Sequence, residues 1–273
     1  MFQGRLLSKP DKTALITGAS AGLGQEFAHQ LAARGYSLVL VARREQRLKA
    51  LASQLRDAHS VAVTPFALDL TDPDGPATLC SELQRLGIDV DYLVNNAGAA
   101  GPDLLLDRDW LAHRAYIELM MTATAALTHL LVPGMVERGQ GRVLNVASMA
   151  GRLMRANDTT YGPSKAWMIA HSEALANTLR GSGVRVLALC PGFVRTEFHA
   201  DPALHELRDS IPSWLWYSAE VVVREGLAAI ERGRVVYVSG RIYRWLDPLT
   251  QSVLTRWLLR GIERPRSQEP NPD

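Results

Sequence analysis

The sequence predicts a doubly wound α/β fold, a parallel sheet of seven strands with helices on both faces. Two observations support this prediction. Short apolar runs, almost continuous as in strands buried on both faces, alternate with longer helical patterns along the chain. Such alternation builds a parallel sheet with right-handed crossovers. Apolar residues make up 47% and charged residues 21% of the 273 residues, an ordinary globular composition that excludes a disordered chain.

The individual elements follow from these patterns. The candidate strands are Thr13–Thr17, Ser37–Ala42, Val61–Phe66, Tyr92–Asn95, Arg142–Ala147, Val184–Cys190 and Arg234–Val238. The helical patterns cover about Leu23–Ala33, Glu45–Arg56, Pro76–Leu86, Arg108–Arg138, Gly162–Arg180 and Ala219–Arg232. Asp72 and Asp107 stand where N-caps are expected. Helices should end near Gly35, Gly87, Gly183 and Gly233.

The chain is expected to form one domain over residues 1–262, followed by a polar, proline-containing tail, 263–273, that we expect to be disordered. The strand–helix rhythm breaks at 195–218, where a short helical pattern over 203–208 stands among large side chains such as Phe198, Trp214 and Trp216. Because a long excursion after a strand of such a sheet lies at its carboxyl edge, where ligands bind, we interpret 195–218 as a substrate lid.

Composition excludes several classes of protein. Two cysteines, Cys80 and Cys190, cannot form a disulfide framework, so we expect a reducing, cytoplasmic location. A net charge of +2 is too balanced for a dedicated nucleic-acid binder. No apolar run reaches the roughly 18 residues of a membrane span, and the N-terminus lacks the apolar core of a secretory signal. The seven histidines show no metal-ligand spacing, so no metal site is expected.

A glycine-rich turn follows the first strand, in Thr17-Gly18-Ala19-Ser20-Ala21-Gly22-Leu23-Gly24. Small residues let the backbone approach a pyrophosphate, which free N–H groups and the helix dipole stabilise. The spacing differs from G-x-G-x-x-G, and a P-loop is excluded because no Gly-Lys-Ser/Thr follows. A tight turn without a ligand is the alternative.

The end of the second strand indicates which dinucleotide would bind. An NAD site would carry Asp or Glu there, whereas this chain has Ala42-Arg43-Arg44. A guanidinium can hold a 2′-phosphate through two hydrogen bonds. We therefore expect NADP(H) in preference to NAD(H), with Arg43 the better candidate. Two solvated arginines at a helix start are the alternative.

Three polar residues are expected to meet near this turn. Tyr161 and Lys165 are four apart at the start of a helical pattern and share one face, and Ser148 ends a strand. Strand ends and helix starts converge at the carboxyl edge of the sheet. A phenol with an ordinary pKa near 10 is a poor acid–base at neutral pH, but a nearby ammonium favours tyrosinate. A hydroxyl such as that of Ser148 can hold a carbonyl oxygen and stabilise developing charge.

Together these motifs resemble the short-chain dehydrogenase/reductase family in its single-domain branch. The matching pieces are Thr17-Gly18-x-x-x-Gly22-x-Gly24, Asp69-Leu70, Asn95-Asn96-Ala97-Gly98, Ser148, Tyr161-x-x-x-Lys165, and Pro191-Gly192 followed by Thr196. The resemblance implies a Rossmann-like fold that carries a nicotinamide cofactor. It implies catalysis by Ser148, Tyr161 and Lys165. The cofactor-binding residues it implies are Gly18, Ser20, Gly22, Leu23, Gly24, Arg43, Asp69, Asn95, Ala97, Gly98, Tyr161, Lys165, Pro191, Gly192 and Thr196.

One position departs from the family pattern. The family usually has an asparagine in the middle of the long fourth helix, where a kink holds a water that relays protons to the lysine. Alignment on Leu130-Leu131-Val132-Pro133-Gly134-Met135 places Met120 at that position. A methionine side chain cannot hold the water by a strong hydrogen bond. Either the relay is rebuilt, through Thr122 or a backbone carbonyl, or catalysis is slow or lost.

The segment 241–262 is amphipathic and basic, with Trp245 and Trp257 among its apolar residues and Pro248 expected to split it. Such helices can lie in a membrane interface, so peripheral membrane contact is one reading. Packing on the chain's own domain or on a partner subunit is the other. The family resemblance also implies homodimers or homotetramers through the fourth and fifth helices.

The sequence thus predicts an NADP(H)-dependent carbonyl reductase or alcohol dehydrogenase. Because the candidate lid is apolar and aromatic, we expect a lipophilic ketone or secondary alcohol as the substrate. The alternative is a catalytically weak or inactive NADP(H)-binding regulatory or scaffold protein of the same fold, which the departure at Met120 motivates.

Overall fold

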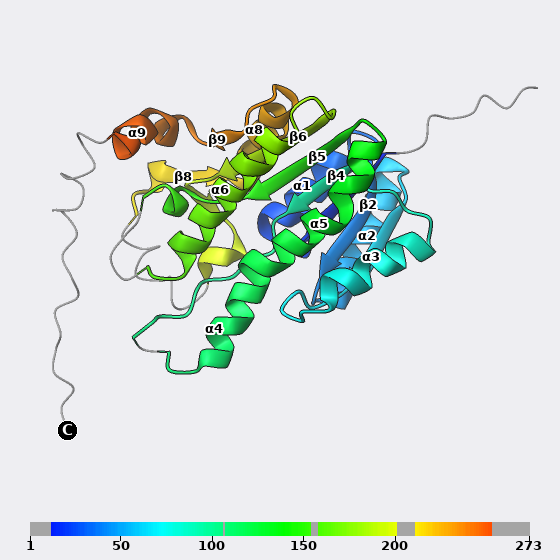
Figure 1. Cartoon of the computed structure of the whole chain (residues 1–273), viewed down its shortest axis with the longest axis horizontal. Coiled ribbons are helices and arrows are strands. Elements are labelled where there is room, and N and C mark those ends of the chain that lie inside the picture. Colours follow the sequence, from blue (N-terminus) through cyan, green and yellow to red (C-terminus); the bar gives the residue numbers. More distant parts are fainter. Residues whose placement is uncertain (1–11, 106, 154–157, 201–210, 253–273) are drawn as a thin grey trace, which may run out of the picture.

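The computed structural model describes residues 12–105, 107–153, 158–200 and 211–252 (Figure 1). Seven parallel strands form one sheet in the order β3-β2-β1-β4-β5-β6-β9. The strands are β1 (Thr13–Thr17), β2 (Ser37–Ala42), β3 (Val63–Ala67), β4 (Tyr92–Asn95), β5 (Gly141–Val146), β6 (Val184–Cys190) and β9 (Val236–Val238). The predicted fold class is therefore confirmed. The strand order reverses between β1 and β4, and open α/β sheets bind ligands beside that point.

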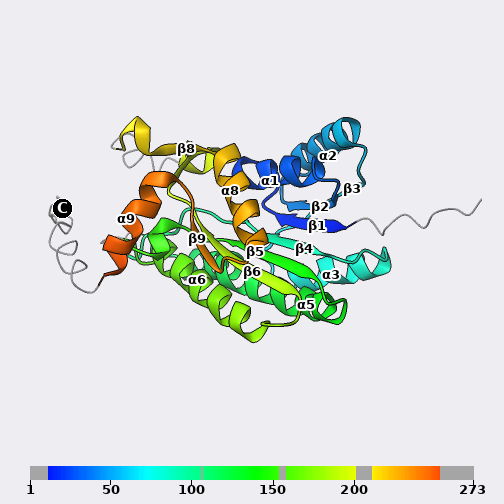
Figure 2. The same ribbon diagram turned by 90° about the horizontal axis from the view of Figure 1, so that it is seen from above.

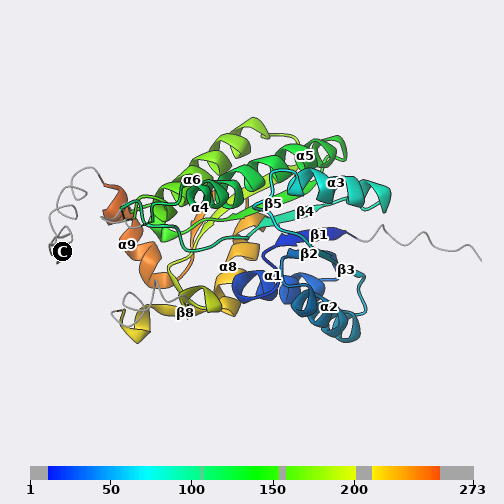
Figure 3. The ribbon, with the colours of Figure 1, turned by 90° about the horizontal axis from the view of Figure 1, so that it is seen from below.

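Helices cover both faces of the sheet (Figures 2 and 3). One face carries α1 (Gly22–Ala32), α2 (Glu45–His59) and α8 (Ala219–Glu231). The other carries α3 (Gly75–Arg85), α4 (Trp110–Ile117), α5 (Ala123–Glu137) and α6 (Tyr161–Thr178). The alternation of strand side chains explains the two layers: along β1, Ala14 and Ile16 join the first core and Leu15 joins the second.

The ends of the helices differ in part from the sequence expectation. Asp72 and Asp107 do not cap helices. The carboxylate of Asp72 accepts a hydrogen bond from the N–H of Asp74 and forms a turn before α3. The carboxylate of Asp107 is bonded to the N–H of Asp103, and Asp109 caps α4 by accepting from the N–H of Leu111. The glycine stops are confirmed at Gly35, Gly87 and Gly233, which have positive φ and follow the ends of α1, α3 and α8 closely. The helix α6 instead ends at Thr178, well before Gly183.

The predicted long helix over 108–138 is interrupted. A π-helical turn, η1 (Glu118–Thr122), separates α4 from α5, and the N–H of Ala123 donates to the carbonyl of Glu118, five residues back. Trp110–Glu137 is, within the described residues, the one helical stretch long and apolar enough for a membrane span, and 39% of its apolar window is buried. Core helices that pack against a sheet meet the same criteria of length and hydropathy.

The chain after β6 forms the region interpreted as a lid. Strands β7 (Phe193–Arg195) and β8 (Trp216–Ser218) pair as a separate parallel ribbon, with short 3₁₀ turns η3 (Glu197–Ala200) and η5 (Ser213–Leu215) between them. The helical pattern over 203–208 lies outside the described residues, as does the tail 263–273.

The chain after β9 forms α9 (Arg241–Gln251), which covers the described half of the amphipathic segment. The expected split at Pro248 is wrong, because the helix continues through this proline to Gln251. A proline removes one helical hydrogen bond and bends a helix without always ending it.

Candidate active site

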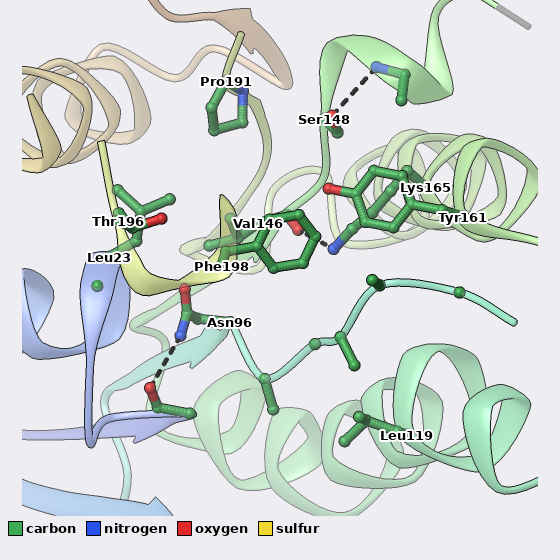
Figure 4. Close-up of a pocket in the computed structure, with 18 of the residues that line it drawn as sticks. Leu23, Asn96, Leu119, Val146, Ser148, Tyr161, Lys165, Pro191, Thr196 and Phe198 are labelled. Atoms are coloured by element: carbon green, nitrogen blue, oxygen red, sulfur yellow. Dashed lines mark hydrogen bonds between the residues drawn. The ribbon is translucent and has the colours of Figure 1, made fainter. Parts of the chain in front are cut away.

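A cleft of ≈ 1410 Å³ opens at the carboxyl edge of the sheet, beside the point where the strand order reverses (Figure 4). The predicted site residues in its lining are Gly18, Ser20, Gly22, Leu23, Arg43, Asp69, Ala97, Gly98, Ser148, Tyr161, Lys165, Pro191, Gly192 and Thr196. The glycine turn follows β1 and the arginines follow β2, whereas Ser148 follows β5. The order of the strands therefore puts the glycine turn and the arginines, a candidate phosphate-binding end, and Ser148, a candidate chemical end, on opposite sides of one cleft.

The glycine turn requires small residues because backbone packs against backbone. Gly18 has φ +65°, and a Cβ there would lie 2.9 Å from the Cα of Ala97. A Cβ on Gly24 would lie 2.2 Å from the carbonyl oxygen of Gly18, so Gly24 shapes the turn from outside the lining of the cleft. Among the described residues, no side chain caps the start of α1. Its first N–H groups are thus available to an anion, which fits a pyrophosphate.

The turn is fixed to β4 by Thr17, whose hydroxyl accepts from the N–H groups of Asn96 (2.9 Å) and Ala97 (3.0 Å). The side-chain amide of Asn96 donates to the carbonyl of Thr17 at 2.9 Å. Sequence reasoning emphasised Asn95, but Asn95 lies outside the cleft lining and its amide donates to Asn145 within the core. The second asparagine of the pair, not the first, faces the cleft.

Two arginines follow β2, and they have different surroundings. The side chain of Arg43 is 71% exposed, with its guanidinium 4.0 Å from the carboxylate of Asp69. Arg44 donates from Nε to the hydroxyl of Ser20 at 3.1 Å, which links it to the glycine turn. The guanidinium of Arg44 also contacts Glu197, at 3.0 Å. Sequence reasoning did not find Glu197 because no local motif marks it.

The chemical end of the cleft brings Ser148, Tyr161 and Lys165 together (Figure 4). Ser148 opens the turn η2 (Met149–Gly151), and its hydroxyl accepts from the N–H of Ala150 at 3.1 Å. Tyr161 and Lys165 lie one helical turn apart at the start of α6. The amine of Lys165 donates to the carbonyl of Val146 at 2.7 Å and lies 5.7 Å from the centre of the Tyr161 ring.

Burial dominates the acid–base properties of this group. It raises the pKa of Tyr161 to about 12, a rise that hydrogen bonding to Ser148 opposes and the charge of Asp158 increases. Burial also lowers the pKa of Lys165 to about 8. We expected Lys165 to supply part of a lowering of the phenol's pKa. In the protein by itself the pKa of Tyr161 is raised instead, because burial disfavours the charged form of both groups. At neutral pH the phenol carries its proton.

The start of the candidate lid lies directly on the site. A Cβ on Gly22 would lie 3.2 Å from the Cβ of Thr196, so this threonine covers the glycine turn. The ring of Phe198 lies 5.6 Å from that of Tyr161, and Figure 4 places it between Thr196 and the catalytic candidates. The segment 196–198 thus spans the cleft from its phosphate-binding end to its chemical end.

Met120 lies within the π-helical turn and its side chain is fully buried. Its sulfur lies 3.3 Å from where a Cβ on Gly98 would be, so the methionine packs behind the cleft while Leu119 lines it. The kink is therefore made without an asparagine. A π-helical turn displaces backbone carbonyls from regular bonding, and such turns recur at functional sites.

The remaining lining at the chemical end is mostly apolar, and of its members the sequence pointed only to the aromatic residues of the candidate lid. Its apolar members include Leu119, Met149, Leu153, Phe193, Phe198, Tyr243 and Leu246, and the cleft is also lined by the polar side chains of Asp103, Asp107, Asp158 and Thr160. Within the described part of the chain, no group of three or more His, Cys, Asp or Glu could hold a metal.

Comparison with known proteins agrees with this geometry. A family model described as short chain dehydrogenase matches residues 12–206. The chain belongs to the short-chain dehydrogenase/reductase family. It is 37% identical over 205 residues to an uncharacterized oxidoreductase of Myxococcus xanthus, which covers 73% of this chain and 81% of the relative. It is 38% identical over 185 residues to a sulfoacetaldehyde reductase of Chromohalobacter salexigens, covering 67% and 72%.

Solved structures of dehydrogenases are also similar. The short-chain dehydrogenase from Sphingobium yanoikuyae in complex with NADPH is 30% identical with a TM-score of 0.78, covering 96% of this chain and 100% of that one. A bulky-bulky ketone specific alcohol dehydrogenase from Comamonas testosteroni is 26% identical with a TM-score of 0.75, covering 96% and 97%. As a short-chain dehydrogenase/reductase, the chain is an oxidoreductase that binds a nicotinamide cofactor and acts on alcohol or ketone groups of small molecules.

Proposed function

We propose that this short-chain dehydrogenase/reductase is an NADP(H)-dependent reductase of lipophilic ketones, with Ser148, Tyr161 and Lys165 as its catalytic residues. One observation carries the proposal: a phenol whose pKa is raised to about 12 lies beside a hydroxyl and a buried amine in a cleft shaped for a dinucleotide. A protonated phenol at neutral pH is a proton donor, which favours carbonyl reduction as the working direction.

The reaction needs a hydride at the carbonyl carbon and a proton at the oxygen. When bound in the cleft, the nicotinamide would supply the hydride. The hydroxyl of Ser148 holds the carbonyl oxygen and stabilises the negative charge that develops there. Tyr161 gives its proton to that oxygen and becomes a tyrosinate. The ammonium of Lys165 stabilises the tyrosinate, and its bond to the carbonyl of Val146 keeps the amine beside the ring.

The preference for NADP(H) over NAD(H) is supported by the cations after β2. Arg43 is exposed at the cleft, and Arg44 is hydrogen-bonded to Ser20 in the glycine turn, so two guanidinium groups can reach a 2′-phosphate. The neighbour from Sphingobium yanoikuyae, which is described as a complex with NADPH, adds support. Asp69, Ala97 and Gly98, together with Pro191, Gly192 and Thr196 farther along the cleft, are proposed to hold the rest of the cofactor.

A lipophilic substrate is supported by the apolar lining beside Tyr161, which includes Leu153, Phe198 and Leu246. Residues 195–218 are proposed to act as its lid, since Thr196 and Phe198 already cover the cleft. The similar alcohol dehydrogenase from Comamonas testosteroni is described as specific for bulky-bulky ketones, which agrees with this class.

Fluorescence titration with NADPH and NADH, followed by a panel of carbonyl compounds from sugars to long-chain ketones, tests the proposal. We expect tighter NADPH binding, a loss of this preference in Arg43→Ala and Arg44→Ala, and turnover of apolar ketones. Tyr161→Phe should lower kcat by about 10²–10⁴ while NADPH still binds. Binding of NADPH without turnover of any carbonyl compound would instead support a regulatory or scaffold protein.

The assembly and location of the enzyme are further proposals. We propose a cytoplasmic homodimer or homotetramer through the long helical stretch of α4 and α5 and through α6. Leu111, Ile117 and Leu130 are exposed on the first of these. Peripheral membrane contact through 241–262 is supported by Trp245, which is 83% exposed on α9. Co-sedimentation with anionic vesicles tests this contact. Equal pelleting of the wild type and Trp245→Ser would contradict the proposed membrane contact.

A further inference from the structure

The position of α9 is set by contacts with segments that line the cleft. Tyr243 is buried, and its hydroxyl accepts from the N–H of Phe193 at 3.3 Å and donates to the carbonyl of Leu215 at 2.9 Å. Its ring fills the space beside Gly192, where a Cβ would lie 2.1 Å from the ring. The helix therefore packs as part of the wall of the cleft, at the end of the molecule where the strands finish (Figure 1).

A partly buried ion pair joins α9 to the turn that carries Ser148. The guanidinium of Arg152 donates from Nε and Nη2 to the two carboxylate oxygens of Asp247, with Nη2 2.8 Å from Oδ2. Each of these side chains is only 17% exposed. The carbonyl of Arg152 also accepts from the amide of Gln251 at 2.8 Å. Two bonds from one guanidinium fix orientation as well as distance, so α9 holds Arg152 by both its side chain and its backbone.

Arg152 closes the η2 turn, and this turn packs against the catalytic helix. A Cβ on Gly151 would lie 2.6 Å from the backbone carbon of Lys165, and the N–H of Met149 donates to the carbonyl of Pro191 at 2.9 Å. The turn that begins at Ser148 thus lies between α6 and α9. A movement of α9 would pull on a segment that has little room to adjust.

The two residues of the ion pair each have a leucine as a neighbour in the chain, and both leucines line the cleft. Leu153 follows Arg152 in the turn, and Leu246 precedes Asp247 in α9. Tyr243, one turn earlier on α9, lines the cleft as well. The ion pair consequently sets the distance between two apolar parts of the lining that belong to segments far apart in the sequence.

We propose that the Arg152–Asp247 pair positions the substrate end of the cleft, and that Leu246 is a specificity-determining residue for ketones with a large apolar group. This inference rests on the proposed ketone reductase function. With the pair intact, Leu153 and Leu246 form an apolar wall beside Ser148 and Tyr161. Without it, one charge is left partly buried and α9 is held more loosely, so the wall loses its shape.

The test uses a homologous series of methyl ketones, from acetone to 2-decanone, with the full chain and NADPH. Asp247→Asn and Leu246→Ala should each raise KM for 2-decanone by about tenfold. We expect KM for acetone and the Kd of NADPH to stay unchanged, because neither ligand uses the wall. The exchange Arg152→Asp with Asp247→Arg should restore part of the lost discrimination, since it keeps opposite charges on the two segments.

The control is Glu231→Gln. Arg142 donates to both carboxylate oxygens of Glu231, at 2.8 and 2.9 Å, and neither residue lines the cleft. The carboxylate of Glu231 also accepts from Arg185 at 3.0 Å, and this cluster lies outside the site, so its loss should leave the KM ratio of the two ketones unchanged. An equal change of the ratio in Glu231→Gln and Asp247→Asn would overturn the positioning role. If Asp247→Asn does not fold, Leu246→Ala, at a 45% exposed residue, decides the specificity claim on its own.

Failure of the proposed function is separable from failure of this inference. A wild-type chain that turns over no ketone overturns the reductase proposal. Calorimetric titration of the NADPH-bound protein with the same ketones then tests the wall. Tighter binding of 2-decanone by the wild type, lost in Leu246→Ala, supports the inference. Equal affinities in the wild type and the variant, or no binding to either, overturn it.

Discussion

The buried amine of Lys165 makes the folding stability of this chain depend on pH in a definite direction. Burial lowers the pKa of this lysine to about 8, whereas an unfolded lysine titrates near 10.4. Between these values the unfolded chain binds more protons than the folded one. By linkage, the free energy of unfolding therefore rises as the pH rises through this window.

The size of the effect follows from the two pKa values. One pKa unit corresponds to about 1.36 kcal/mol. At pH 8 the buried amine is half-protonated and costs about 3 kcal/mol of stability, and at pH 10 it is neutral and costs about 1 kcal/mol. Lys165 should thus add about 2 kcal/mol to the free energy of unfolding between pH 8 and 10. Lys165→Met lacks this term, so the stability of the wild type relative to the variant should rise by that amount.

Urea unfolding followed by tryptophan fluorescence measures the difference at the two pH values. The difference in unfolding free energy between wild type and variant is compared at the two pH values. This comparison cancels the effect of the substitution on packing and the titration of groups common to both proteins. Lys49→Met is the control, because Lys49 is 66% exposed and pairs with Glu45 on the surface of α2. A difference between wild type and Lys165→Met that stays constant, or falls, from pH 8 to 10 would refute the reasoning.

Two further predictions concern the backbone of the site. Gly24→Ala should lower the free energy of unfolding by roughly 1–3 kcal/mol and weaken NADPH binding in fluorescence titration, because its Cβ would lie 2.2 Å from the carbonyl oxygen of Gly18. Gly134→Ala, which meets only the flexible end of Arg138, should be neutral or slightly stabilising in urea unfolding; equal losses in both variants would contradict the steric argument. Met120→Leu should keep most of kcat if the backbone of η1 makes the kink, and a loss of more than about tenfold would show that the methionine side chain is needed.

The main sheet could be predicted because each of its strands carries its own signal. Seven apolar runs mark the seven strands, and their limits shift by only one or two residues. Val61 was included in β3 on its hydrophobicity, but the pairing with β2 starts at Val63, opposite Leu38. The π-helical turn could not be predicted, since it keeps a helical pattern. The three-residue strands β7 and β8 are too short for periodicity, and they form only through mutual pairing.

The site could be predicted where local motifs carry the chemistry, as for Tyr161 and Lys165. The residues that were missed act through partners distant in sequence. Glu197 contacts Arg44 across 153 positions, and Asp247 contacts Arg152 across 95. The pKa of Tyr161 was misjudged for a related reason, because spacing along a helix reports a neighbouring charge but not the depth of burial.

The bridge from Glu197 to Arg44 and Arg47, at the start of α2, has a consequence for how the cleft is entered. The carboxylate accepts from Arg44 at 3.0 Å and from Arg47 at 2.9 Å, but all three side chains are about half exposed. Such solvent-exposed pairs contribute only about 0–1 kcal/mol each and weaken further as ionic strength increases. An incoming phosphate can therefore displace Glu197 at little energetic cost. Counter-ions in the buffer compete for the same arginines, so access to this end of the molecule depends on salt.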